Sequence, residues 1–205
     1  MKKQLYPIIG IVLILWGIRC VTGTVSLCAV TINGGVWEKY LGDIVTGAVM
    51  SPGMLVSGIM LVGRRSIGSV CTAVCRFMAA LALYDIVSSV IILLSVNELM
   101  NTPDTLLPGL NSLAASLGFL SGWITLAEAA LYIAAAAFNV RFFQNGKCFV
   151  PAGLLTLLSI LFTIAVYHGQ HLNVIVLWTL MFAAMISAKR SLREEAVAEM
   201  PSAGV

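Results

Sequence analysis

The chain consists almost entirely of apolar segments that are long enough, or nearly long enough, to cross a lipid bilayer. A spanning helix needs about 20 apolar residues to cross ~30 Å of hydrocarbon. Of the 205 residues, 60% are hydrophobic and 10% are charged, whereas a soluble domain carries roughly 25% charged residues. The six segments are approximately 6–30, 41–63, 69–96, 110–138, 148–167 and 171–188. We therefore predict an all-α integral membrane protein: a six-helix transmembrane bundle over 1–188 and a cytoplasmic tail over 189–205.

Lysine and arginine are distributed unevenly between the two sides of this predicted bundle. With the N-terminus placed inside, nine of them fall on the inner side and only Lys39 falls outside, while Arg19 and Arg76 lie within spans. Basic residues accumulate in cytoplasmic loops of membrane proteins. The pattern therefore predicts a multi-pass protein of the cell (inner or plasma) membrane with both termini in the cytoplasm. The nine inner residues are Lys2, Lys3, Arg64, Arg65, Arg141, Lys147, Lys189, Arg190 and Arg193.

Four ionisable side chains lie inside the predicted spans, where each costs ~2.5 to 3.5 kcal/mol at a helix centre. At a rise of about 1.5 Å per residue, Arg19, Asp85 and Glu128 lie roughly 20, 25 and 18 Å from the cytoplasmic end of their spans, in one shared layer. Arg76 lies only about 10 Å in, where its long side chain can reach the inner headgroups. We expect Arg19 to pair with Asp85 or Glu128, which leaves the other carboxyl group unpaired or protonated.

Helical spacing adds hydroxyl groups to this layer. In the fourth span Ser121, Thr125, Glu128 and Tyr132 follow at i, i+4, i+7 and i+11, so they share one face of the helix. Similar polar stripes follow Arg19 and Asp85 in the first and third spans. The sequence therefore predicts a polar midplane site that binds a small polar solute or protons. Its predicted substrate-binding residues are Arg19, Asp85, Glu128, Ser121, Thr125, Tyr132 and Ser88.

A structural interpretation of the same residues is also open. An ion pair can simply tie helices together, and serine or threonine can bond its own helix backbone. The second span carries Pro52 near its middle, which predicts a kinked helix, or alternatively a discontinuous one that lines a cavity. Gly118 and Gly122 form a GxxxG pattern, which favours close packing against a helix of the same chain or of a second copy.

The sequence lacks the residues that several kinds of catalytic and cofactor site require. The sequence holds no P-loop, no glycine-rich nucleotide motif, no His-Glu-x-x-His and no histidine at membrane depth, so we expect no enzyme, no cofactor and no metal. It also lacks the clustered basic surface that nucleic-acid binding requires. The expected partners are the lipid bilayer, a small polar solute, and a second copy or another membrane subunit.

Two functions of different classes remain. The first is a small membrane transporter or solute-binding membrane subunit that uses the polar midplane site. The second is a non-transporting accessory or scaffold membrane protein, which acts through protein partners or lipid and uses its charges structurally. In size, span count and orientation the chain resembles the substrate-capture subunits of energy-coupling-factor transporters. This likeness is one of architecture, and no motif carries it.

Overall fold

The chain folds entirely into α-helices over the residues that its computed structural model describes, which are 2–34, 37–63, 65–100, 110–166 and 171–198. The helices are α1 (Lys2–Gly34), α2 (Trp37–Val62), α3 (Ile67–Met100), α4 (Leu110–Asn145), α5 (Phe149–Ala165) and α6 (His171–Ala198). Each predicted apolar segment coincides with one of them, which confirms the all-α fold. Residues 101–109 and 167–170, which connect α3 to α4 and α5 to α6, lie outside the described residues.

Five of these helices are long and apolar enough to cross a membrane: α1, α2, α3, α4 and α6. The sixth, α5, is apolar but has 17 residues, which corresponds to about 26 Å and to the lower end of the spanning range. The helix α2 continues through Pro52 as one element. The α6 helix continues past Lys189 as far as Ala198.

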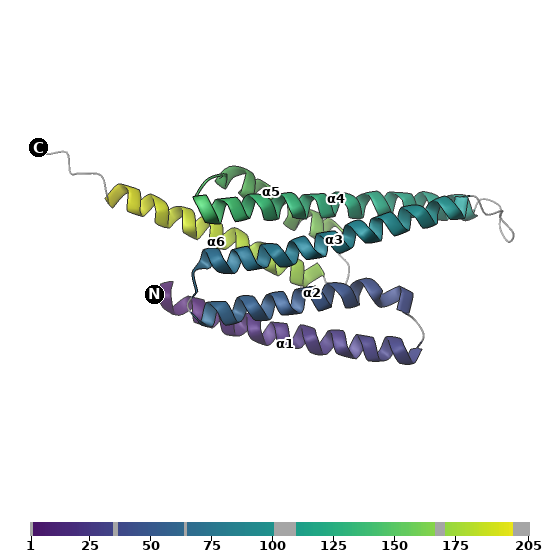
Figure 1. The fold of residues 1–205 in the computed structure, drawn as a ribbon, viewed down its shortest axis with the longest axis horizontal. Helices are drawn as coiled ribbons and strands as arrows, with labels where there is room; N and C mark the ends of the chain where they lie inside the picture. The colour runs from purple at the N-terminus through teal and green to yellow at the C-terminus, as the bar shows by residue number, and fades with distance from the viewer. Residues whose placement is uncertain (1, 35–36, 64, 101–109, 167–170, 199–205) are drawn as a thin grey trace, which may run out of the picture.

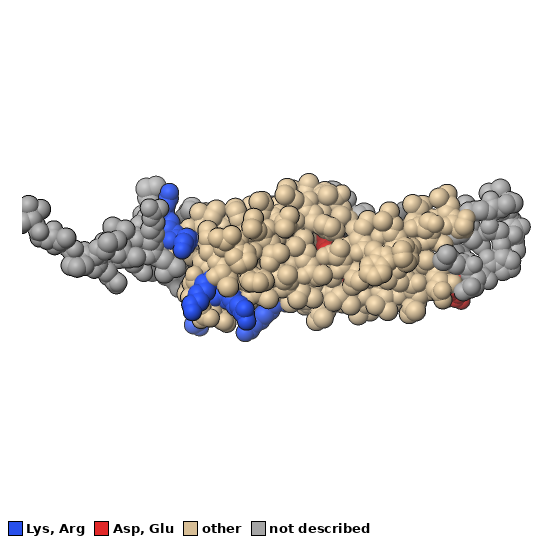
Figure 2. Space-filling model, turned by 90° about the horizontal axis from the view of Figure 1, so that it is seen from above, with Lys and Arg blue, Asp and Glu red and all other residues tan. Residues whose placement is uncertain are grey.

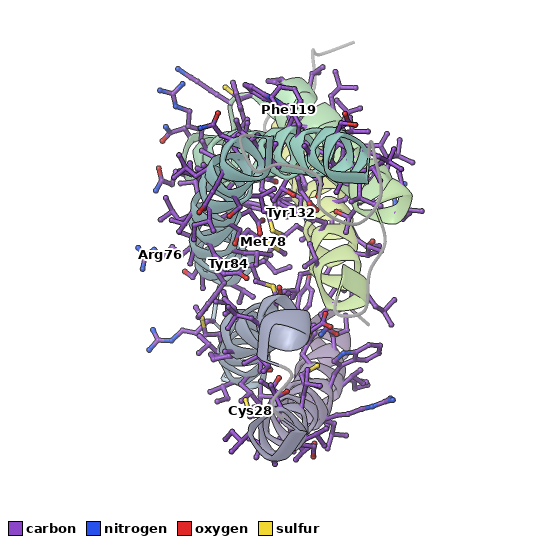
Figure 3. The ribbon with its side chains drawn as sticks, turned by 90° about the vertical axis from the view of Figure 1, so that its right-hand side faces the viewer. Cys28, Arg76, Met78, Tyr84, Phe119 and Tyr132 are labelled. Carbon is purple, nitrogen blue, oxygen red and sulfur yellow. The ribbon has the colours of Figure 1, made fainter. Side chains whose placement is uncertain are left out.

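The helices are arranged as three consecutive hairpins, α1–α2, α3–α4 and α5–α6, in an elongated bundle (Figure 1). The most extensive helix pairs are α3 with α4 and α1 with α2, and α5 packs on both α4 and α6. Seen end-on, the α1–α2 pair lies to one side of the group formed by α3, α4, α5 and α6 (Figure 3). The start of α1 and the end of α6 lie at the same end of the bundle (Figure 1).

Bulky aliphatic side chains lie mostly on the outside of the bundle, whereas small, sulfur-containing and polar side chains lie inside. Leu83, Leu94 and Leu154 are more than half exposed, while Ala82, Ala129 and Met78 are fully buried. Lipid tails are as apolar as leucine, so burying leucine between helices gains little in a membrane, and close packing of small residues drives association instead. This distribution supports a bundle whose outer surface faces lipid.

The α1–α2 hairpin is packed through glycines. A Cβ atom added to Gly10 would lie 2.7 Å from the carbonyl oxygen of Gly58, and one added to Gly58 would lie 2.6 Å from that of Gly10. The two backbones therefore touch at this point, as in small-residue contacts between membrane helices. In the α3–α4 hairpin, Gly118 faces Val96 and Gly122 faces Leu93. The predicted GxxxG contact is thus made to α3 of the same chain.

Lysine and arginine are concentrated at one end of the face that Figure 2 shows. Figure 2 shows lysine and arginine gathered at the end of the bundle where α1 begins and α6 ends, with the middle of the visible face almost free of charge. A band of apolar surface bounded by charge at one end is typical of a protein that crosses a membrane.

Replacing Gly10 by valine should separate α1 from α2, because the new side chain would overlap the backbone of Gly58. We expect Gly10→Val to destabilise the protein by ~1 to 3 kcal/mol and to lower its unfolding temperature in detergent. The matched control is Gly23→Val on the same helix, because a Cβ atom there would meet nothing within 4 Å. Equal effects of the two substitutions would contradict the glycine contact.

Candidate functional site

A carboxyl group lies buried between α4 and α5 and is held by a chain of hydroxyl groups. Glu128 is only 5% exposed, and the Tyr132 hydroxyl donates to its Oε1 atom at 2.6 Å. The same hydroxyl lies 2.6 Å from Oγ1 of Thr163 on α5, which in turn lies 2.6 Å from the carbonyl oxygen of Ser159. These short distances suit O–H···O bonds, including bonds to an ionised carboxylate.

The proton count of this chain allows two arrangements, because each hydroxyl carries a single proton. With Glu128 ionised, Tyr132 donates to the carboxylate and Thr163 can donate to Tyr132. With Glu128 protonated, the donors can run the other way, from Glu128 to Tyr132, from Tyr132 to Thr163, and from Thr163 to the Ser159 carbonyl. Protonated Glu128 therefore completes one proton for each of the three contacts. With Glu128 ionised, two protons serve three contacts, so the contact between Thr163 and the Ser159 carbonyl oxygen has no proton and must lengthen.

A second carboxyl group belongs to this cluster. Asp85 on α3 is half-buried and lies close enough to Glu128 and Tyr132 for its charge to act on both. Met78, Ala82 and Ser89, which share its face of α3, are each fully buried. The α3 face that carries Asp85 is therefore turned into the bundle, and the structure brings Asp85, Glu128 and Tyr132 together as predicted from their depths.

The polar cluster continues along the α4–α5 contact toward the end where the two helices join. Nδ2 of Asn139 donates to Oγ1 of Thr156 at 2.7 Å and to the carbonyl oxygen of Ala135 at 2.8 Å. Thr156, Ser159 and Thr163 are all fully buried, together with Ala152. They follow at i, i+4, i+7 and i+11, so the inward face of the otherwise apolar α5 is small and polar.

Two buried polar atoms near this cluster have no hydrogen-bond partner in the described structure. They are Oδ1 of Asn139 and Nε1 of Trp178. The Trp178 ring on α6 packs against the Tyr132 ring, with centroids 5.6 Å apart. Oδ1 of Asn139 is an acceptor and Nε1 of Trp178 is a donor. Leaving a buried polar group without a partner costs ~1 to 3 kcal/mol. The protein alone therefore does not satisfy this polar interior.

Arg19 lies away from the two carboxyl groups. It is exposed on α1, which packs chiefly on α2 and reaches α6 through the bond from Trp16 to Asn173. Arg19 is at the middle of the apolar stretch Tyr6–Ile32, 13 residues from either end. Arg19 thus lies midway along the apolar stretch of α1, but the structure does not bring it to the carboxyl pair.

The other predicted residues are divided between the interior and the surface. Ser121 is exposed and Thr125 is half-buried, and the Thr125 hydroxyl donates to the Ser121 carbonyl oxygen within α4. Ser88 is half-buried beside the fully buried Ser89. Arg76 is exposed and points away from the bundle (Figure 3). The polar face of α4 is therefore buried only from Glu128 onward.

Sequence reasoning from intramembrane charges missed the hydroxyl and amide groups that complete the cluster. These residues are uncharged, so a search for costly charges passes over them. The usable signal was the spacing of small and polar residues in α5, which repeats like the buried seam of a helix. The missed residues are Asn139, Thr156, Ser159, Thr163 and Trp178.

Comparisons of the chain with protein-family models, with curated proteins and with solved structures each find no match. The site is therefore interpreted from its own geometry.

Removing the central hydroxyl should weaken the α4–α5 contact. We expect Tyr132→Phe to destabilise the protein by ~0.6 to 1.7 kcal/mol, which are the average and the largest values measured for hydrogen bonds between membrane helices, because it breaks the bonds to both Glu128 and Thr163. Equilibrium unfolding in detergent measures the change. Tyr84→Phe, at the edge of the same core, is the matched control, and an equal loss in both variants would contradict the assigned network.

The outward position of Arg19 can be tested separately. We expect Arg19→Leu to leave the unfolding free energy unchanged within ~0.5 kcal/mol or to raise it, because the side chain is exposed and lies at membrane depth. Glu128→Leu should instead be destabilising, since it strands the Tyr132 and Thr163 hydroxyls. Comparable destabilisation by Arg19→Leu would show that Arg19 does pair within the bundle.

Proposed function

We propose that this chain is a small membrane transporter or solute-binding membrane subunit in which Asp85 and Glu128 take up and release a proton. The observation that carries the proposal is a buried carboxyl group with a second carboxyl group near it, on a hydroxyl chain whose donors can run in either direction. Ionisable residues inside membrane bundles are rare and mark ion or substrate pathways more often than structure.

The pair lacks the expected counter-charge, which favours a proton over a salt bridge. Arg19 was the expected partner, but it is exposed on α1. Two like charges at close range in a medium of low dielectric repel strongly, so the doubly ionised state is the unfavourable one. A shared proton is the simplest way to hold Asp85 and Glu128 together. The unpaired atoms of Asn139 and Trp178 support access of water or a polar solute to the same interior.

The proposed arrangement in the membrane has six crossings, a kink at Pro52, and both termini in the cytoplasm of a cell whose inner or plasma membrane holds the protein. The gathering of lysine and arginine at the end where α1 begins and α6 ends (Figure 2) supports this orientation. The crossing by α5 is supported by its apolar outer face, on which Leu154, Leu158 and Leu161 are more than half exposed.

A scaffold function is the second candidate, and a specific observation favours it. The bonds from Asn139 to Thr156 and from Tyr132 to Thr163 join α4 to α5, and such bonds can exist only to hold helices together. On this alternative Glu128 stays in one protonation state throughout.

Glu128→Gln distinguishes the two functions, because glutamine keeps an oxygen for Tyr132 but cannot exchange a proton. We expect the wild-type protein in lipid to show a pH-dependent carboxyl band in infrared difference spectra, and Glu128→Gln to lose most of it while its unfolding free energy changes by less than ~1 kcal/mol. Asp85→Asn should alter the same band, whereas Glu98→Gln, near the far end of α3, serves as the control.

A wild-type spectrum without such a band, or a band that persists in Glu128→Gln, would exclude the proton-handling role. Reduced membrane level and stability in Glu128→Gln, with no spectral change, would favour the scaffold. Thermal stabilisation of the purified protein by members of a panel of polar metabolites would then identify a solute, because a ligand stabilises the state that it binds.

A further inference from the structure

A cavity of about 350 Å³ lies between the α1–α2 hairpin and helices α3 and α6. Its walls are apolar and come from all four helices, with Leu13, Leu61, Val74 and Met181 among them. Its volume falls at the lower end of the ~300 to 1,000 Å³ that small-molecule sites occupy. We call it the deep cavity. It lies apart from the carboxyl pair, and neither Asp85 nor Glu128 lines it.

The deep cavity adjoins a larger and more polar space of about 560 Å³, here called the mouth. Three residues line both spaces: Tyr6, Ile67 and Ser187. The remaining walls of the mouth include the first turn of α3 and the residues Gln144, Asn145 and Gly146 at the end of α4. An apolar chamber with a polar entrance matches a ligand that is itself apolar at one end and polar at the other.

The charge around the mouth indicates the sign of the polar end. Among the side chains that the structure describes, every charged residue within two sequence positions of a mouth residue is basic: Arg65, Arg141, Lys147, Lys189 and Arg190. The first turn of α3, with Ile67 and Gly68 at the mouth, also presents the positive end of a helix dipole. The C-terminal end of α4 contributes the negative end of a helix dipole, equivalent to roughly half a charge. The several full positive charges near the mouth outweigh it.

The mouth lies at the level at which a lipid headgroup would lie in the proposed membrane arrangement. It lies at the end of the bundle where lysine and arginine gather (Figure 2), whereas the deep cavity extends toward the apolar middle. A ligand seated here would keep the orientation of a lipid in that leaflet, with its anionic end at the surface and its chain inside. The small volume of the deep cavity favours one acyl chain over the two of a phospholipid.

We infer that the deep cavity and its mouth bind a single-chain anionic amphiphile, such as a fatty acid, with its chain between α1, α2, α3 and α6 and its anionic group beside Arg65. Burying each methylene group contributes ~0.8 kcal/mol, so most of the affinity comes from the chain and the head group sets the selectivity. This site does not depend on the proton-handling role of Asp85 and Glu128, and either can fail alone.

The test uses the full chain in nanodiscs of phosphatidylcholine and phosphatidylglycerol, with a photoreactive twelve-carbon fatty acid whose diazirine is near the methyl end. We expect saturable labelling, which mass spectrometry places on residues that line the deep cavity, such as Val74 and Met181. Excess dodecanoate should compete, while dodecanol should compete at least about tenfold less well, because it lacks the charge.

Paired variants locate the two ends of the ligand. Val74→Phe should fill the deep cavity and abolish saturable labelling, whereas Val87→Phe, at a lipid-exposed position of the same helix, should leave it unchanged. Ala184→Leu fills the cavity from α6 and replaces Val74→Phe if that variant does not fold. Arg65→Gln should weaken dodecanoate binding about fivefold or more, and Arg76→Gln, which removes an exposed arginine away from the mouth, should not.

The proposal is overturned by labelling that spreads over lipid-facing residues and resists competition. It is also overturned if a higher phosphatidylglycerol content competes with the label as effectively as dodecanoate does. The deep cavity would then hold ordinary bilayer lipid. A wild-type protein that shows normal labelling but no pH-dependent infrared band would exclude the proton-handling role and leave this site intact.

Discussion

A carboxyl group buried in hydrocarbon must find its hydrogen-bond partners on neighbouring helices, and the place of α5 in this protein follows from that constraint. Glu128 is bonded through Tyr132 to Thr163 on α5, and Asn139 repeats the connection to Thr156. The outer face of α5 is rich in leucine, which lipid solvates as well as a protein interior would. Its inner face of small and polar residues is therefore what gives α5 a preferred orientation against α4.

Close contacts at glycine residues hold α1 to α2 and α3 to α4. Backbone contact at Gly10 and Gly58 unites α1 with α2, and Gly118 and Gly122 bring α4 close to α3. The α1–α2 and α3–α4 hairpins are thus tightly packed. The deep cavity lies where the α1–α2 hairpin meets α3 and α6, at a contact between such units. A space for a ligand is least costly at that kind of boundary, because widening it breaks fewer close contacts.

The sequence predicts where the helices lie along the chain better than it predicts how each helix is rotated about its axis. Apolar length located the helices, and the rise per residue placed Asp85, Glu128 and Arg19 in one layer. The direction in which a side chain points also depends on the rotation of its helix about the helix axis. For α1, which carries Arg19, the glycine contacts with α2 set this rotation, and they cannot be predicted from residues taken one at a time. On α4 the spacing of Glu128 and Tyr132 at i and i+4 supplied the rotation, so their shared face was predicted correctly. The polar inward face of α5 is equally regular, but it carries no charged residue. A search for costly charges inside the membrane therefore does not find it.

The two proposed sites share two helices. On α6, Trp178 packs against Tyr132 of the carboxyl cluster, while its neighbour Leu177 and Met181 one turn away line the deep cavity. On α3, Val74 lines the cavity, and the buried face that carries Asp85 begins one turn further along. Coupling between two sites requires an element with two arrangements that both sites bias. The hydroxyl chain supplies two arrangements at the carboxyl cluster, and the contact of Trp178 with Tyr132 joins that cluster to a helix that lines the deep cavity.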